Sequence, residues 1–165
     1  MGDDVFADVL DANAGYADAF RLRGIRARAG RGLAVLTCMD SRIEPLAMLG
    51  LEPGDAKILR NAGARVTDDV LRTLVLATYL LGVDRVMVIA HTNCRMTIGH
   101  EEEIHTAIRE AGGPDTHSLA FLTTDDLSTT LRDDVQRIRS SPYLQQLRVG
   151  GFLYDVETGR LEQVV

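Results

Sequence analysis

The sequence is poor in several features that would direct it to particular classes of protein. Its 165 residues contain no tryptophan, four prolines and two cysteines. No apolar run approaches the roughly 18 residues that a helix needs to cross a bilayer. Lysine and arginine number 18 against 24 aspartates and glutamates, so the net charge is −6. Nucleic acids and anionic membrane surfaces bind to clustered basic residues, so we expect neither as a partner and predict a small-molecule substrate instead.

The beginning of the sequence and its few cysteines bear on location. The first residues, MGDDVFADVL, are acidic, whereas a secretory signal begins with basic residues. We therefore expect a cytoplasmic protein. In a reducing cytosol, a pair of cysteines is more often buried, catalytic or metal-binding than bridged, so a disulfide between Cys38 and Cys94 is the less favoured alternative.

Short apolar runs predict strands that are buried on both faces, as in a parallel sheet. They are LAVLTC from Leu33, AKILR from Ala56 and RVMVIAH from Arg85. Between the second and third runs, a helical pattern covers residues 68–81, with Thr67 or Asp68 as its cap and Gly82 as its end. This order is that of a strand–helix–strand unit.

The rest of the chain extends the same pattern. Further helices are expected over 99–111 and 125–140, and loosely spaced apolar residues predict one or two short helices within 3–28. The tail, GFLYDVETGRLEQVV, has alternating stretches on either side of a turn sequence, which predicts a hairpin. The predicted fold class is α/β, with a mostly parallel central sheet, flanking helices and an antiparallel edge hairpin.

This length and composition predict a single domain. We expect it to span residues 1–165, with an amino-terminal helical arm over 1–31 and an α/β core over 32–165 that carries the functional site.

Potential metal ligands occur where two of the predicted strands end. Cys38 ends the first strand, His91 ends the third, and Cys94 follows three residues later. Ligands bind beyond the carboxyl ends of strands in open parallel sheets, so these side chains converge if the strands are neighbours. Two thiolates and one imidazole suit Zn²⁺, and three protein ligands leave the fourth tetrahedral position open, as in catalytic sites. We therefore expect one zinc ion per chain, bound by Cys38, His91 and Cys94.

Asp40 and Arg42 follow the first cysteine in the motif CMDSR. A carboxylate at this spacing can accept a hydrogen bond from zinc-bound water or occupy the open position itself. The planar guanidinium of Arg42 can hold Asp40 off the metal, and ionised, through two parallel hydrogen bonds. Asp40 and Arg42 are therefore candidate catalytic residues. The alternative is that Asp40, Ser41 and Arg42 form only a capped turn before a helix, and these residues taken alone favour that alternative.

The motif CMDSR, followed by RNAG from Arg60 and by HTNC, resembles the β-class carbonic anhydrases in order and spacing. The match covers residues 33–99, and the chain is similar to the short members of that family. The resemblance implies zinc-dependent, reversible hydration of carbon dioxide to bicarbonate, with the Asp40–Arg42 pair beside the metal. It also implies a homodimer, or an oligomer built from dimers, in which the amino-terminal helix packs on the partner.

The RNAG loop lies near the metal according to this resemblance. Ala62 and Gly63, together with Val66, are then expected to form a tight apolar wall suited to carbon dioxide, and Asn61 completes the predicted substrate pocket. As an equal alternative, Asn61 and Gly63 serve only as turn residues.

The sequence leaves three functions open. The first is hydration of carbon dioxide, and the second is hydrolysis of a sulfur analogue, carbonyl sulfide or carbon disulfide, by the same fold and metal. The third is a non-catalytic dimer that binds zinc with Asp40 locked on the metal. The first two use the same residues, so the sequence does not separate them.

Overall fold

The computed structural model describes residues 5–97 and 99–165. Its five-stranded sheet has the order β2-β1-β3-β4-β5. The strands are β1 Leu33–Cys38, β2 Ala56–Asn61, β3 Arg85–His91, β4 Arg148–Tyr154 and β5 Leu161–Gln163. Strands β1 to β4 run parallel, and β5 pairs with β4 in the antiparallel sense. The predicted fold class is thereby confirmed.

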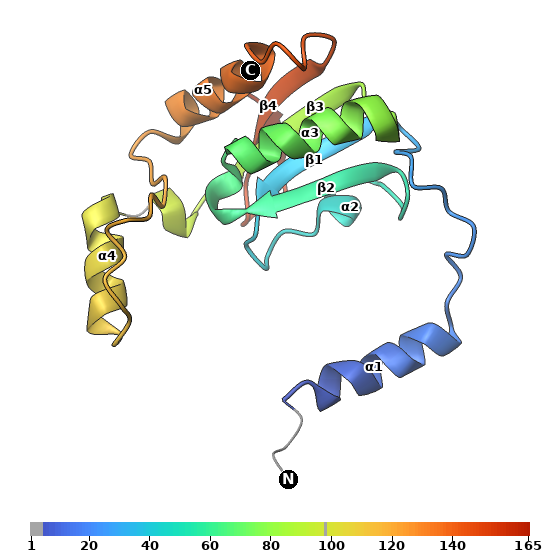
Figure 1. Ribbon diagram of the computed structural model, residues 1–165, viewed down its shortest axis with the longest axis horizontal. Helices are drawn as coiled ribbons and strands as arrows, with labels where there is room; N and C mark the ends of the chain where they lie inside the picture. Colours follow the sequence, from blue (N-terminus) through green and yellow to red (C-terminus); the bar gives the residue numbers. More distant parts are fainter. Residues whose placement is uncertain (1–4, 98) are drawn as a thin grey trace.

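The helices cover both faces of this sheet unequally (Figure 1). They are α1 Ala7–Asp18, α2 Pro45–Met48, α3 Asp68–Leu81, α4 Glu101–Glu110 and α5 Leu127–Arg139, with short 3-10 turns η1 Ala62–Ala64 and η2 Arg95–Thr97. Helices α3 and α5 pack on one face, and the short α2 packs on the other. None of the helices in the described ranges is both long and apolar enough to cross a membrane.

The central strand β1 shows why its sequence is almost uninterruptedly apolar. All of its residues are buried. Ala34 and Leu36 belong to the core beneath α3 and α5, whereas Leu33 and Val35 belong to the core on the α2 side. Alternate side chains of a strand point to opposite faces, so a strand covered on both sides needs apolar residues throughout.

Helix α3 begins and ends at the residues that its sequence indicates. The Thr67 hydroxyl accepts a hydrogen bond from the backbone N–H of Val70 at 3.4 Å, which satisfies one free donor of the first turn. Gly82 ends the helix in the left-handed conformation, with φ of 74°. This helix returns the chain to the start of β3, so β1 and β3 become neighbours.

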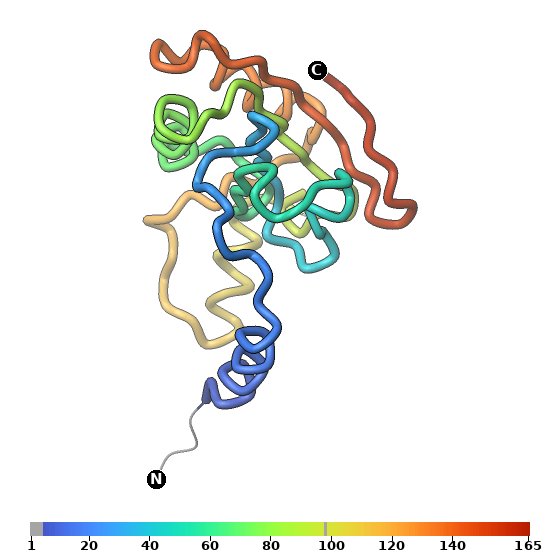
Figure 2. Tube along the Cα trace, turned by 90° about the vertical axis from the view of Figure 1, so that its right-hand side faces the viewer, coloured from blue at the N-terminus to red at the C-terminus, as the bar shows by residue number. Residues whose placement is uncertain are grey.

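Helix α1 stands away from the sheet and its covering helices in both views (Figures 1 and 2). It has no buried residue within the described chain. The segment 5–20 nevertheless exposes large apolar side chains, namely Val5, Phe6, Val9, Leu10, Tyr16 and Phe20. An exposed apolar face on a helix is typical of a surface that associates with another protein chain.

Helix α4 and the segment that follows it form a second projection (Figure 1). His105 is buried there, and its Nδ1 lies 2.9 Å from the Thr116 hydroxyl. Its ring stacks on that of His117 with a centroid distance of 4.5 Å. His117 in turn contacts Asp115 and Glu102, so this projection has its own polar cluster.

Candidate metal centre

The topology brings Cys38, His91 and Cys94 together at the carboxyl edge of the sheet. Cys38 is the last residue of β1, His91 is the last residue of the adjacent β3, and Cys94 lies in the turn after β3. Their ligand atoms all lie within 4.8 Å of one another, and all three residues are buried. The residues are far apart in the sequence, so the parallel pairing of β1 with β3 creates the cluster.

His91 is oriented as a metal ligand would be. Its Nδ1 lies 2.8 Å from the carbonyl oxygen of Thr92, so this nitrogen donates its proton and Nε2 keeps the lone pair. Nε2 is buried and has no hydrogen-bond partner among the described residues. A buried nitrogen acceptor left without a partner beside two sulfurs fits a borderline-soft metal ion such as zinc.

The two thiols interact strongly with each other. A hydrogen bond from Cys94 lowers the pKa of Cys38, and the backbone N–H of Gly63 adds to this effect from 3.3 Å. The same hydrogen bond, together with burial, raises the pKa of Cys94. Burial opposes the charged form of His91, but the neighbouring Cys38 sulfur raises the pKa of the imidazole overall. The site therefore stabilises at least one thiolate, which is the form that binds metals.

Asp40 and Arg42 form the two side-chain hydrogen bonds that the sequence suggests. Arg42 Nε donates to Asp40 Oδ1 at 2.9 Å, and Nη2 donates to Oδ2 at 2.7 Å. Hydrogen bonds from the Arg42 side chain hold the pKa of Asp40 well below its usual range. The backbone N–H of Arg42 also donates to Oδ1 at 3.0 Å, so the capped turn exists in addition to the side-chain pair.

The turn after β3 also contacts this pair. Arg42 Nη2 donates to the carbonyl oxygen of Asn93 at 3.0 Å. Asn93 has a positive φ of 52°, a conformation that asparagine tolerates better than most residues. Asn93 is a site residue that sequence reasoning missed. Its one signal in the sequence is its place between His91 and Cys94, with an amide side chain that tolerates the left-handed conformation.

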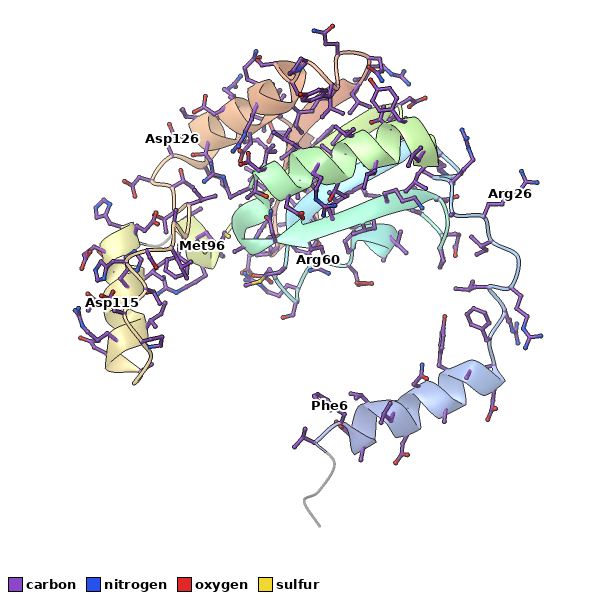
Figure 3. All side chains as sticks on the ribbon, viewed as in Figure 1. Phe6, Arg26, Arg60, Met96, Asp115 and Asp126 are labelled. Atoms are coloured by element: carbon purple, nitrogen blue, oxygen red, sulfur yellow. The ribbon has the colours of Figure 1, made fainter. Side chains whose placement is uncertain are left out.

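Arg60 is a second residue that sequence reasoning missed. It lies near the end of β2 (Figure 3) and donates from Nε to the carbonyl oxygen of Cys38 at 3.0 Å. Its Nη2 donates to the carbonyl oxygen of Asp40 at 2.7 Å. The RNAG motif contains Arg60, but hydrogen bonds to backbone carbonyls leave no pattern in a sequence.

The residues predicted to form the substrate pocket lie in three different places, namely at two separate cavities and in the core. Asn61 bonds to the backbone of Arg65 in both directions, at 2.7 and 2.8 Å, and so shapes the turn between them. Asn61 and Ala62 line a cavity of about 500 Å³, whereas Gly63 lines a small cavity shared with His91. Val66 is 1% exposed and belongs to the core beneath α3 and α5.

Gly63 illustrates why the RNAG turn needs a glycine. Its φ is 76°, and a Cβ at this position would lie 3.2 Å from the Cβ of Met96. The left-handed backbone also directs the Gly63 N–H toward the sulfur of Cys38. Both conditions favour glycine over any residue with a side chain.

Comparison with known proteins gives consistent results. A family model for carbonic anhydrase matches residues 33–161. β-Carbonic anhydrase 1 of Mycobacterium tuberculosis is 32% identical over 160 residues, which cover 95% of this chain and 96% of the relative. The crystal structure of carbonic anhydrase from Streptococcus mutans aligns over 100% of both chains with a TM-score of 0.91 and 34% identity. A carbon disulfide hydrolase of Acidianus sp. is 30% identical over 95% of this chain and 89% of its own length.

The fold and the donor set define an α/β protein with a group of residues at the strand ends that could hold a metal ion. The family model spans the sheet from the start of β1 to the start of β5. The chain belongs to the β-carbonic anhydrase family and is an enzyme of that zinc-dependent family.

Proposed function

We propose that this enzyme catalyses the reversible hydration of carbon dioxide to bicarbonate and a proton. One zinc ion per chain is held by Cys38, His91 and Cys94. The observation that carries the proposal is the buried cluster of these residues, whose ligand atoms lie within 4.8 Å of one another. A zinc ion in such a site supplies a hydroxide nucleophile near neutral pH.

The protein groups around the metal have separate tasks in this proposal. His91 keeps its proton on Nδ1, where it donates to the Thr92 carbonyl, and leaves Nε2 for the metal. Asp40 stays ionised because Arg42 lowers its pKa, so its carboxylate accepts a hydrogen bond and orients the attacking group. Arg42 holds both oxygens of Asp40 and thereby keeps the carboxylate off the metal.

The substrate wall is the less defined part of the site. We assign Ala62 and Gly63 to the surface that carbon dioxide approaches, with Asn61 holding their turn in place. Val66 supports the turn from the core, where it is buried, and has no direct contact with substrate in this proposal.

Isotopic oxygen exchange between carbon dioxide and water tests the proposed reaction. Zinc-loaded protein, assayed by mass spectrometry across a range of pH, is expected to accelerate this exchange far above the rate of buffer alone. Metal-free protein prepared by chelation is the control and is expected to be inactive. Zinc-loaded protein with one metal per chain and no acceleration would falsify the proposal.

Hydrolysis of carbon disulfide is the second candidate reaction. The similarity to the carbon disulfide hydrolase of Acidianus sp., at 30% identity, favours it over unrelated reactions. Release of hydrogen sulfide from carbon disulfide, measured on the same zinc-loaded preparation, tests it directly. A higher kcat/KM for carbon disulfide than for carbon dioxide would make it the principal activity.

A non-catalytic zinc module fits the site less well. It requires Asp40 on the metal, whereas the Asp40 carboxylate is engaged at both oxygens by Arg42. Absence of both activities in zinc-loaded protein, with X-ray absorption showing carboxylate coordination, would favour this alternative.

We further propose that the active form is a homodimer in which α1 packs on the partner. The apolar residues Val9, Leu10, Tyr16 and Phe20 support this assembly, since each is at least 40% exposed in the single chain. Light scattering at micromolar concentration is expected to give twice the mass of the 18.1 kDa chain. A mass of a single chain would exclude the dimer.

We also propose a cytoplasmic location. Both cysteines are free thiols within the proposed zinc site, and thiol ligands persist in a reducing compartment. Fractionation of cells that express the protein from its own gene checks this assignment.

A further inference from the structure

The Arg60 side chain donates hydrogen bonds to the backbone of the segment that carries Cys38 and Asp40. Its Nε donates to the carbonyl oxygen of Cys38 at 3.0 Å, and its Nη2 donates to that of Asp40 at 2.7 Å. The guanidinium therefore spans Met39 and binds the carbonyl oxygens of the residues before and after it. Within the ranges 5–97 and 99–165, no carboxylate forms an ion pair with Arg60, so its charge serves these carbonyl groups.

Packing does not account for this arrangement. Arg60 is an exposed residue of β2, and Met39, which lies between Cys38 and Asp40 in the sequence, is 67% exposed. The N–H of Met39 donates to the carbonyl of Asn61 at 3.0 Å, so the end of β2 already pairs with the chain leaving β1. The hydrogen bond from Arg60 to the carbonyl of Asp40 adds a contact one residue beyond that pairing, at the residue that bears the carboxylate.

The Asp40–Arg42 pair is consequently held from two sides. On one side, Arg42 Nη2 bonds to the carbonyl of Asn93 in the turn that carries Cys94. On the other side, Arg60 bonds to the carbonyl of Asp40 itself. A carboxylate two residues after a metal ligand has only a short backbone link, so a small rotation of the Asp40 peptide decides where its oxygens lie.

We propose that Arg60 is a positioning residue for Asp40. It holds the Asp40 peptide so that the carboxylate stays paired with Arg42 and away from the metal. The hydrogen bonds that the Arg60 side chain makes to the described residues go to backbone carbonyls and not to the carboxylate or the metal ligands' side chains, so Arg60 acts through the backbone. The consequence for catalysis depends on the proposed function, but the consequence for the Asp40–Arg42 geometry does not.

The test compares Arg60→Lys and Arg60→Gln with the wild-type protein, and Arg72→Gln is the matched control. Lysine keeps the charge but cannot donate to both carbonyls as a planar fork does. Arg72 is an exposed arginine of α3 whose side chain pairs only with a neighbour on its own helix, Asp69. Circular dichroism and the main amide NMR signals establish that each variant is folded.

The first readout uses the reduced, metal-free protein. The Arg42 Nε–H signal in an isotope-edited NMR spectrum, assigned by its loss in Arg42→Lys, reports the pairing with Asp40. We expect this signal to move toward the position of a free arginine in both Arg60 variants and to stay unchanged in Arg72→Gln. An unchanged signal in folded Arg60→Gln overturns the proposal, whatever the activity of the enzyme.

The second readout uses zinc-loaded enzyme. We expect both Arg60 variants to bind one zinc per chain and to lose at least about tenfold in kcat for carbon dioxide hydration, because small misplacements of catalytic groups carry penalties of that order. Wild-type activity in Arg60→Lys, with loss in Arg60→Gln, would show that only the charge matters and would overturn the positioning role. If wild-type enzyme lacks the activity, the proposed function fails while the NMR comparison still decides the role of Arg60.

Discussion

The metal centre and helix α1 are opposite kinds of region within one chain. The three candidate metal ligands lie at the ends of β1 and β3 and in the turn after β3, and they are buried. Hydrogen bonds from Arg42 and Arg60 link the chain segments around them. Helix α1 buries none of its residues, although segment 5–20 carries large apolar side chains. The three candidate ligands of the first region come from a single chain, whereas the second region exposes large apolar side chains.

The two regions therefore differ in what they are able to bind. The metal centre has a donor atom available for an ion, since His91 Nε2 is buried without a hydrogen-bond partner among the described residues. Helix α1 has an apolar surface available for a partner, since its apolar side chains are exposed. Substitutions in the first region are therefore expected to change metal binding and chemistry, and substitutions in the second are expected to change assembly.

The largest effect is expected for Cys38→Ser in the metal centre. Losing even a partner of a metal ligand costs roughly 10–100-fold in affinity, so losing the ligand itself is expected to cost at least about 100-fold. Zinc content after dialysis, together with carbon dioxide hydration, measures the loss, and Met39→Leu at the exposed neighbouring position is the control. A Cys38–Cys94 disulfide in the wild-type protein, or full zinc content in Cys38→Ser, contradicts this prediction.

Arg42→Ala should separate chemistry from metal binding. The variant keeps all three proposed ligands and is expected to retain zinc, but it frees the Asp40 carboxylate. Hydrogen bonds to charged groups are worth about 1.5–3 kcal/mol each, so activity is expected to fall at least about tenfold. Zinc content and the rate of hydration are measured on the same sample, with Ser41→Ala as the control.

Asp40→Asn is the complementary variant. It is also expected to keep zinc and to be slow, because an amide does not present the carboxylate that accepts and orients the attacking group.

Full activity in Arg42→Ala at neutral pH would show that residues 40–42 form only a capped turn.

Leu10→Asp tests the other side of the comparison. Leu10 is 58% exposed in a single chain, so a monomer would tolerate the charge with little change. Burial of a leucine side chain is worth about 1.5–3 kcal/mol, so an interface with this helix is expected to weaken at least about tenfold in Kd. Sedimentation across concentrations measures the shift, and Asp11→Asn on the same helix is the control. An unchanged Kd in Leu10→Asp excludes this face of α1 from the interface.

The smallest effect is expected in the α4 projection, whose polar cluster is independent of the metal. A hydrogen bond to Asp115, with a second to Glu102, raises the pKa of His117. A raised pKa means that this pairing stabilises the fold below the ordinary histidine pKa of about 6.5 and ceases to do so as the pH rises past the folded value. Asp115→Asn is expected to lower the pKa of His117, which NMR titration of its ring protons measures, with Glu110→Gln as the control. Carbon dioxide hydration is expected to stay unchanged.

Much of the sheet was predictable because each buried strand has a local signature. The runs from Leu33, Ala56 and Arg85 coincide with β1, β2 and β3. Strand β1, covered on both faces, is almost uninterruptedly apolar, whereas the edge strand β2 carries Lys57 and Arg60 and has no buried residue. The cap at Thr67 and the glycine at position 82 similarly bound α3, since both act on the backbone nearby. The tail hairpin was recognised, but β4 begins at Arg148, three residues before the stretch that the sequence indicated, because the adjacent glycines Gly150 and Gly151 interrupt the apolar pattern.

The sequence by itself determined the kind of chemistry, because the residue types in CMDSR and HTNC restrict which ions and protons can be bound. Only the tertiary structure decided which atoms meet. The pairing of β1 with β3 joins Cys38 to His91, and the pairing of β1 with β2 brings the Arg60 fork to the carbonyls of Cys38 and Asp40. Hydrogen bonds to backbone carbonyls depend on chain position rather than residue type, so no pattern of side chains encodes them. The fold also decided that α1 is exposed. An apolar helix has the same sequence pattern whether residues of its own chain or of a partner cover it.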